Sequence, residues 1–196
     1  MVTPLVGVLA LQGAFAAHSR ILAPLGVKTL EVRTVEELAS VDALVIPGGE
    51  STTISMLLDR GGLLDPLSQR VSAGLPVLGT CAGLILLSSH ILDGRSDQHC
   101  LGAIDVDVRR NGYGTQADSF ESDIDVVGFD SKFHAVFIRA PVVTRTGDEV
   151  EVFANVDGNA VLCRQGHITV AAFHPELSGD DRVHRQFVQS INSGGQ

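Results

Sequence analysis

The 196-residue chain has few of the features that mark secreted or membrane-bound proteins. It contains three cysteines, Cys81, Cys100 and Cys163, and this odd, sparse set excludes a disulfide framework and fits reduced thiols. Its longest mostly apolar stretch, residues 75–87, is too short to cross a bilayer. The N-terminus lacks a basic region ahead of its apolar run, so no signal peptide is expected. These absences together predict a cytoplasmic protein.

Positive charge is also scarce, with 14 Lys and Arg against 23 Asp and Glu and a formal net charge of −9. This balance argues against nucleic acid or an anionic membrane as the main partner. No Gly-Lys-Ser/Thr ending and no Gly-x-Gly-x-x-Gly pattern is present, so a nucleotide site is not expected. We expect no metal or cofactor either, since His99-Cys100 has no further His or Cys at ligand spacing.

The hydrophobic pattern predicts one α/β domain over residues 1–192, followed by a flexible tail at 193–196. Strand-like and helix-like runs alternate in the first half, which is typical of a parallel sheet covered on both faces. The expected strands there are Leu5–Leu11, Lys28–Val32, Ala43–Ile46 and Val77–Thr80, and the helices are Phe15–Leu25, Thr53–Arg60, Leu64–Ala73 and Ala82–Ser89. The second half is richer in strands, expected at Ile104–Val108, Ala135–Ile138, Val150–Ala154, Ala160–Cys163 and Ile168–Phe173, before a helix at Asp181–Ile191.

Gly-Thr-Cys-Ala-Gly at 79–83 is the most informative stretch, because it joins an expected strand directly to an expected helix. This is the pattern of a nucleophile elbow with cysteine in the serine position. Small residues relieve backbone crowding at the sharp turn, and the turn should push Cys81 out into solvent. The free N–H groups at the start of the following helix favour a thiolate. A buried, inert cysteine is the alternative interpretation for an isolated residue.

His174-Pro175-Glu176 follows the last expected strand and could supply a base for Cys81. An imidazole at a strand end can accept the thiol proton, and a carboxylate two residues on can orient it. On its own, the tripeptide would be read as a loop with a solvated carboxylate. Together with the elbow, it predicts a Cys81-His174-Glu176 triad.

Pro-Gly-Gly-Glu-Ser-Thr-Thr at 47–53 follows another expected strand. Its glycines allow backbone N–H groups to point into a site, as an oxyanion hole requires. Ser51 or Thr52 is expected to cap the next helix. A plain glycine turn and a phosphate-cradling loop are the alternatives.

These three motifs resemble the class I, triad-type glutamine amidotransferases. Leu-Gln-Gly at 11–13, Arg110-Asn111, Asp-Ser-Phe-Glu at 118–121 and Phe-Ile-Arg-Ala-Pro at 137–141 narrow the resemblance to the glutaminase subunits of pyridoxal 5′-phosphate synthases. The resemblance covers nearly the whole chain and implies a three-layer α/β sandwich with a mainly parallel central sheet. Residues 112–116 depart from the pattern of the relatives, which puts the contacts of that loop in doubt.

The resemblance also implies a function, namely hydrolysis of L-glutamine with delivery of ammonia to a (β/α)8-barrel synthase. It maps Cys81, His174 and Glu176 to catalysis. It maps the following residues to glutamine binding and oxyanion stabilisation: Gly48, Gly49, Glu50, Ala82, Arg110, Ile138 and Arg139. His18 is expected on an exposed helix face, which in the relatives lies towards the synthase. A free-standing cysteine hydrolase or chaperone and a catalytically silent binding subunit remain the alternatives.

Overall fold

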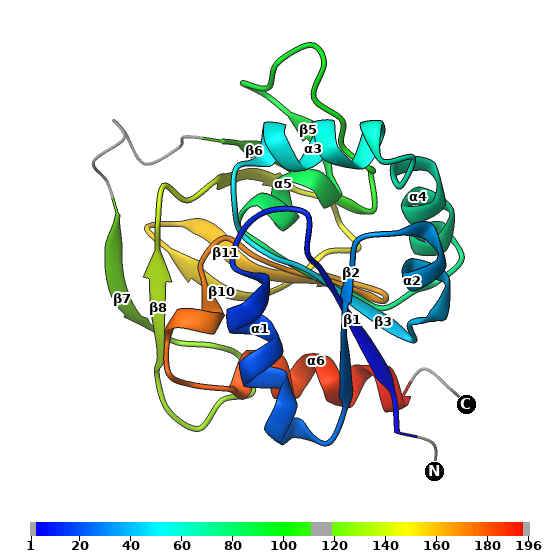
Figure 1. Cartoon of the computed structure of the whole chain (residues 1–196). Coiled ribbons are helices and arrows are strands. Elements are labelled where there is room, and N and C mark those ends of the chain that lie inside the picture. The colour runs from blue at the N-terminus through cyan, green and yellow to red at the C-terminus, as the bar shows by residue number, and fades with distance from the viewer. Residues whose placement is uncertain (1–2, 111–118, 194–196) are drawn as a thin grey trace.

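The computed structural model describes residues 3–110 and 119–193 (Figure 1). Helical elements are α1 (Phe15–Leu22), η1 (Ala23–Leu25), α2 (Val35–Ser40), α3 (Ser51–Arg60), α4 (Leu64–Ser72), α5 (Ala82–Leu87), η2 (Pro175–Leu177) and α6 (Arg182–Ser193). Strands are β1 (Leu5–Leu9), β2 (Lys28–Val32), β3 (Ala43–Ile46), β4 (Val77–Thr80), β5 (Ser88–Ile91), β6 (Ile104–Arg109), β7 (Phe120–Ile124), β8 (Phe133–Phe137), β9 (Val142–Thr146), β10 (Glu151–Val156), β11 (Asn159–Gln165) and β12 (Ile168–Ala171).

A seven-stranded sheet forms the centre, in the order β10-β11-β12-β4-β3-β1-β2. Its five strands from β12 to β2 are parallel, while β10 and β11 add an antiparallel edge. The central strands β3 and β4 are buried at every position, as expected for parallel strands covered on both faces. The prediction of an α/β fold with a mainly parallel sheet is confirmed.

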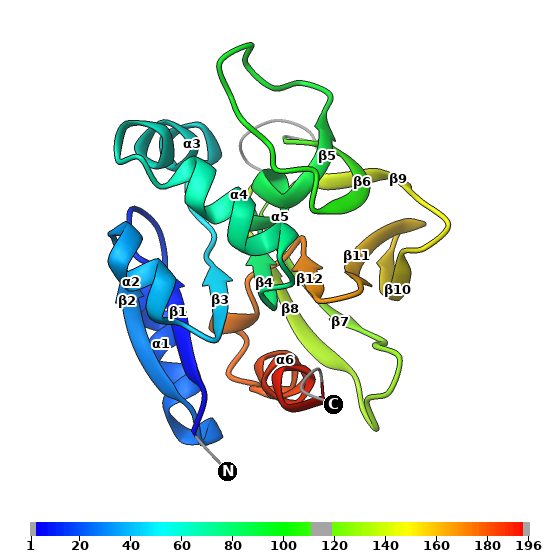
Figure 2. The same cartoon turned by 90° about the vertical axis from the view of Figure 1, so that its right-hand side faces the viewer.

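Helices cover both faces of this sheet (Figures 1 and 2). On one face, α1 and α6 pack against each other, and on the other α3 contacts α4 and α5 while α2 contacts α4. Two smaller β units complete the fold, a three-stranded sheet β5-β6-β9 and the hairpin β7-β8. The hairpin packs over the end of β12, where the Phe173 ring lies tilted against Phe133 and edge-on to Phe137.

Several sequence predictions need correction. The helix expected to end at Ser89 stops at Leu87, because Ser88 turns to extended backbone and begins β5. The strands expected to end at Leu11 and Phe173 stop at Leu9 and Ala171, which leaves their last residues free for the site. Ser193 belongs to α6 rather than to a tail, and residues 194–196 lie outside the described residues. The elements α2, β5, β7 and β9 were not predicted at all.

Candidate active site

Four neighbouring parallel strands deliver the predicted site residues to one edge of the sheet. In the order β12-β4-β3-β1, they lead into His174, Cys81, Gly48-Gly49 and Gln12-Gly13. The carboxyl ends of parallel strands share one edge, which is where α/β proteins place their sites. Segments distant in sequence are therefore brought together by strand order alone.

The turn at Cys81 is as sharp as the Gly-x-Cys-x-Gly pattern predicts. Cys81 has φ 49° and ψ −101°, a conformation that costs a non-glycine residue roughly 1–3 kcal/mol. A Cβ at Gly79 would lie 2.8 Å from the Gly83 carbonyl carbon, and one at Gly83 would collide with the Ile46 carbonyl. Both glycines are thus required by close backbone approach. The expectation that Cys81 projects into solvent is wrong, since it is 7% exposed and faces a cavity.

The His174 side chain lies beside Cys81 and is fixed from behind. Its Nδ1 is 2.7 Å from Glu176 Oε1, and its backbone N–H donates to the Val136 carbonyl at 2.8 Å. Glu176 is held in the short helix η2, and its carboxylate is fully buried. The β8 strand therefore sets the backbone of His174, while Glu176 orients its ring.

The electrostatics of this pair favour a charged imidazole. Burial lowers the pKa of His174, but hydrogen bonds with Cys81 and Glu176 outweigh it and raise that pKa to about 10. Burial likewise raises the pKa of Glu176, yet the hydrogen bond with His174 brings the net shift below the ordinary value. Glu176 is therefore ionised at neutral pH, despite its burial.

The Pro-Gly-Gly-Glu loop lies across from Cys81. The Gly48 carbonyl accepts a hydrogen bond from the Ala14 N–H at 3.1 Å, which fixes the Gly48–Gly49 peptide against the start of α1. A Cβ on Gly48 would collide with the His174 ring, and one on Gly49 with Gln12 Oε1. Neither position has room for a side chain.

Glu50, rather than Ser51 or Thr52, caps α3. Its carboxylate accepts hydrogen bonds from the N–H groups of Thr52 and Thr53 and from both hydroxyls. Burial works to raise the pKa of Glu50, but these hydrogen bonds lower it to about 2. The prediction of a Ser51 or Thr52 cap is thus wrong, because the longer carboxylate reaches back over the first turn.

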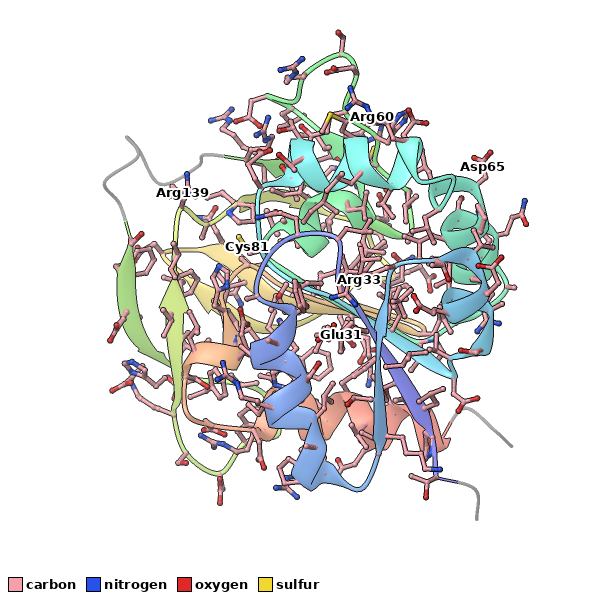
Figure 3. The ribbon with its side chains drawn as sticks, in the orientation of Figure 1. Glu31, Arg33, Arg60, Asp65, Cys81 and Arg139 are labelled. Carbon is pink, nitrogen blue, oxygen red and sulfur yellow. The ribbon has the colours of Figure 1, made fainter. Side chains whose placement is uncertain are left out.

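Arg110 and Arg139 reach the same cavity from the other side. Arg110 Nη2 is 3.1 Å from Glu50 Oε1, while its buried Nε has no hydrogen-bond acceptor among the described residues. Arg139 is exposed and has φ 45°, a second strained backbone at this place. Figure 3 labels Arg139 and Cys81, the two strained residues that line the cavity. Residues 111–118, which include the 112–116 loop, lie outside the described residues.

These elements enclose a cavity of about 540 Å³, enough for a small polar molecule. It is lined by Gln12, Gly13, Ala14, Gly48, Gly49, Glu50, Ser51, Cys81, Ile85, Arg110, Ile138, Arg139, His174 and Leu177. All predicted site residues line it except Ala82, which is buried directly after Cys81, and Glu176, which lies behind His174.

The prediction for His18 is wrong, because its side chain is completely buried rather than exposed. Its Nε2 lies 3.3 Å from Glu176 Oε2, and its Nδ1 lies 2.8 Å from Nε2 of the equally buried His184. His184 was not singled out from the sequence. Both histidines lie on apolar helix faces at the α1–α6 contact, a placement that their helical spacing could have indicated.

Within residues 3–110 and 119–193, no group of three or more His, Cys, Asp or Glu side chains could hold a metal ion. Over the same residues, no helix has the length and apolar character needed to cross a membrane. Cys163 is buried in β11, and burial raises its pKa to about 12, which fits the expectation that it is structural.

The fold and the site together define a class of protein, an α/β sandwich with a cysteine at a strand-to-helix elbow beside a His-Glu pair. A solved structure described as a glutamine amidotransferase superposes with a TM-score of 0.89 at 46% identity, covering 95% of this chain and 98% of the other. PurLQS from Thermotoga maritima, at 15% identity and a TM-score of 0.67, shares the fold.

Sequence comparison narrows this class. The SNO glutamine amidotransferase family model matches residues 8–193, and the chain belongs to that family. The pyridoxal 5′-phosphate synthase subunit PdxT of Mycobacteroides abscessus is 58% identical over 98% of this chain and 100% of its own length. The PdxT of Corynebacterium jeikeium is 50% identical, with 97% and 98% covered.

Proposed function

We propose that this chain hydrolyses L-glutamine to L-glutamate and ammonia, and that it supplies the ammonia to a pyridoxal 5′-phosphate synthase. The observation that carries the proposal is the meeting of Cys81, His174 and Glu176 at one end of a cavity that also contains guanidinium groups. Full-length similarity to PdxT proteins supports it.

In the first half-reaction, Cys81 Sγ attacks the side-chain carboxamide carbon and His174 holds the proton taken from the thiol. The raised pKa of His174 suits this role, because the imidazolium is stable next to a thiolate. Collapse of the tetrahedral intermediate breaks the carbon–nitrogen bond. His174 then donates the proton to the leaving nitrogen, so that ammonia departs and a γ-glutamyl thioester remains on Cys81.

In the second half-reaction, His174 takes a proton from water, whose oxygen attacks the thioester carbonyl. Glutamate is released and the proton returns to Cys81. In both steps the carbonyl oxygen becomes an anion, and we propose that the N–H groups of Gly49 and Ala82 stabilise it. Gly49 lines the cavity and Ala82 follows Cys81 at the start of α5, which supports this proposal.

The amino-acid end of glutamine would lie towards Arg110 and Arg139. Arg110 Nε is buried without an acceptor among the described residues, as expected for a group that awaits a carboxylate. Glu50 supplies the negative charge that suits the α-ammonium group, although two threonines and Arg110 already engage its carboxylate. Ile138 lines the cavity beside Arg139 and would contact the aliphatic part of the substrate.

The partner that best fits this chemistry is a (β/α)8-barrel synthase, as the family resemblance implies. Ammonia is mostly protonated in neutral water and then cannot act as a nucleophile, so direct transfer preserves it. We place the docking face at the hollow beside α1, which is lined by Ala17, Arg20, Ile21, Glu176, Leu177, Gly179, Asp180 and Asp181. Leu177 lines both this hollow and the glutamine cavity. At the start of α1, the Ala14 N–H donates a hydrogen bond to the Gly48 carbonyl, so a partner that docks beside α1 can change the conformation of the oxyanion loop.

The test is glutamate release from glutamine with increasing amounts of the synthase subunit. The isolated chain should be weakly active, and the partner should raise kcat several-fold or more by flipping the Gly48–Gly49 peptide, whose carbonyl accepts a hydrogen bond from the Ala14 N–H. A Gly49→Ala variant should not be stimulated, because its Cβ would collide with Gln12. Full activity that is independent of the partner, or hydrolysis of peptides instead of glutamine, would favour the free-standing cysteine hydrolase.

A further inference from the structure

The Glu176 carboxylate has a second side, which faces the interior instead of the cavity. Its Oε1 contacts His174 at 2.7 Å, whereas its buried Oε2 makes no hydrogen bond with any described residue. One polar group from another element approaches this oxygen, and a second polar group contacts the first. His18 Nε2 on α1 lies 3.3 Å from Oε2, and Thr80 Oγ1 at the end of β4 lies 3.3 Å from the same nitrogen.

A second buried imidazole stands behind the first. His184 Nε2 on α6 lies 2.8 Å from His18 Nδ1, and both side chains are 0% exposed. Burial lowers the pKa of His18 to about 4 and that of His184 to about 3, despite the opposing charge of Glu176. Both rings are therefore neutral at neutral pH, and each carries one N–H.

The proton positions follow from the partners. His18 Nε2 lies 3.3 Å from both Thr80 Oγ1 and the anionic Glu176 Oε2. A nearby anion stabilises an N–H rather than a bare nitrogen, so we place the His18 proton on Nε2, and its Nδ1 becomes an acceptor. The His184 proton must then lie on Nε2, pointing at His18. This leaves His184 Nδ1 as a bare acceptor, and that atom indeed has no partner among the described residues. An unpaired acceptor nitrogen costs less than an unpaired N–H would at this depth.

We propose that His18 is a positioning residue for the glutaminase reaction, holding ionised Glu176 from its inner side, and that His184 fixes His18 in the tautomer this requires. The inference rests on the proposed function. Without the His18 donor, the buried carboxylate would bind a proton more readily and would lose its hold on His174. The chain of contacts also ties both α1 and α6 to the triad.

The test compares His18→Asn with His18→Gln in the complex with the synthase subunit. The two amides differ by one methylene, and the longer Gln places its N–H near the position of Nε2, within reach of Glu176. The shorter Asn reaches towards His184 instead. We expect His18→Asn to lower kcat roughly tenfold or more with KM nearly unchanged, and His18→Gln to recover most of it.

The pH dependence of kcat/KM distinguishes a positioning role of His18 from a role in packing alone. In His18→Asn the acid limb of kcat/KM should move to higher pH, and in His184→Gln it should move in the same direction by less. Leu67→Ala, a truncation at a buried position of α4, controls for lost stability and should leave the profile in place. If His18→Asn does not fold, the shift in His184→Gln decides.

If both His18 variants keep the kcat and the pH profile of an active wild-type complex, the inference is overturned while the proposed function stands. Equal losses in His18→Asn and His18→Gln without a shift in the profile would also overturn it, because packing would then explain them. A wild-type complex that releases no glutamate would instead refute the proposed function.

Discussion

Histidines contact both faces of the Glu176 carboxylate, and their pKa values are shifted in opposite directions. On the cavity face, His174 has its pKa raised to about 10 and is charged. On the inner face, His18 and His184 have pKa values lowered to about 4 and about 3 and are neutral. All three are largely or completely buried, so burial alone does not decide the outcome.

The difference arises from the partners. His174 lies between two groups that can be anionic, Cys81 and Glu176, and their attraction exceeds the cost of desolvation. For His18, burial outweighs the attraction of Glu176, which acts from a longer distance, 3.3 Å against 2.7 Å, and the charge on His174 lowers the pKa of His18 further. One buried carboxylate therefore supports one imidazolium, and additional histidines serve it as neutral donors.

Cys81→Ala removes the nucleophile on the cavity face of Glu176 and leaves the histidines on the inner face unchanged. We expect the glutaminase rate to fall by about 10³-fold or more, because the nucleophile is lost. Steady-state glutamate release measures this, with circular dichroism to check the fold. Cys100→Ala is the matched control, since that thiol lies outside the cavity and should leave the rate unchanged. Near-normal activity of Cys81→Ala would remove it as the nucleophile.

The two members of the His-Glu pair should differ in severity. His174→Ala should be nearly inactive, because His174 moves protons in both half-reactions. Glu176→Gln should be impaired but measurable, since an amide still contacts the ring but cannot support its charge. Comparison of kcat for the two variants checks this order. A fully active Glu176→Gln variant would mean that neither face depends on the charge.

Substitution of the two arginines that line the cavity tests whether they pair with the α-carboxylate of glutamine. Arg110→Ala or Arg139→Ala should raise the glutamine KM more than it lowers kcat, because the α-carboxylate is bound alike in ground and transition states. A lost charge-assisted hydrogen bond is worth about 1.5–3 kcal/mol, or roughly ten- to a hundredfold in KM. Arg60→Ala, exposed at the end of α3, is the control. An unchanged KM in both variants would exclude these arginines from glutamine binding.

The smallest expected effect is on the pH dependence of the free energy of unfolding. The histidines on the two faces of Glu176 should change it in opposite directions. The pKa of His184 falls from 6.5 to about 3 on folding, so its stabilisation is complete above pH 6.5 and is lost as pH falls. The pKa of His174 rises to about 10, so its contribution is complete below pH 6.5 and is lost towards pH 10.

His184→Gln should therefore flatten the acid side of the stability curve by up to about 1 kcal/mol per pH unit. Urea unfolding between pH 6.5 and 4.5 measures the slope, and the difference from wild type removes the contribution of the carboxyl groups. His174→Gln should flatten the alkaline side instead. Identical slopes for wild type and His184→Gln would show that His184 is not held neutral in the folded state.

The sequence predicted the cavity face well and the inner face poorly. Cys81, the paired glycines and His-Pro-Glu stand at strand ends, and parallel strands bring such ends to one edge. Ile46, Thr80 and Ala171 end their strands close to the expected positions, so the loops that follow were placed correctly. His18 and His184 could not be paired from the sequence, because their contact depends on how α1 and α6 pack.

The missed elements have physical reasons of two kinds. The short helix α2 carries a complete capping box, in which Thr34 and Glu37 bond reciprocally, and this signal was available in the sequence. The strand β7 buries only its last residue, Ile124, and carries charged residues at two of its five positions, whereas β9 is buried only at its first two positions and pairs with β6, which precedes β7 and β8 in the chain. Such strands are defined by tertiary packing rather than by their own composition.

The most direct test of the account uses a glutamine analogue that carries a diazoketone in place of the carboxamide. A thiolate at the site would displace nitrogen from the protonated reagent and form a stable thioether. Mass spectrometry of the labelled complex should find one adduct, on Cys81, and excess glutamine should slow its formation. Labelling of Cys100 or Cys163 instead, or no adduct on a folded and partner-bound chain, would contradict a glutamine-binding cysteine at the elbow.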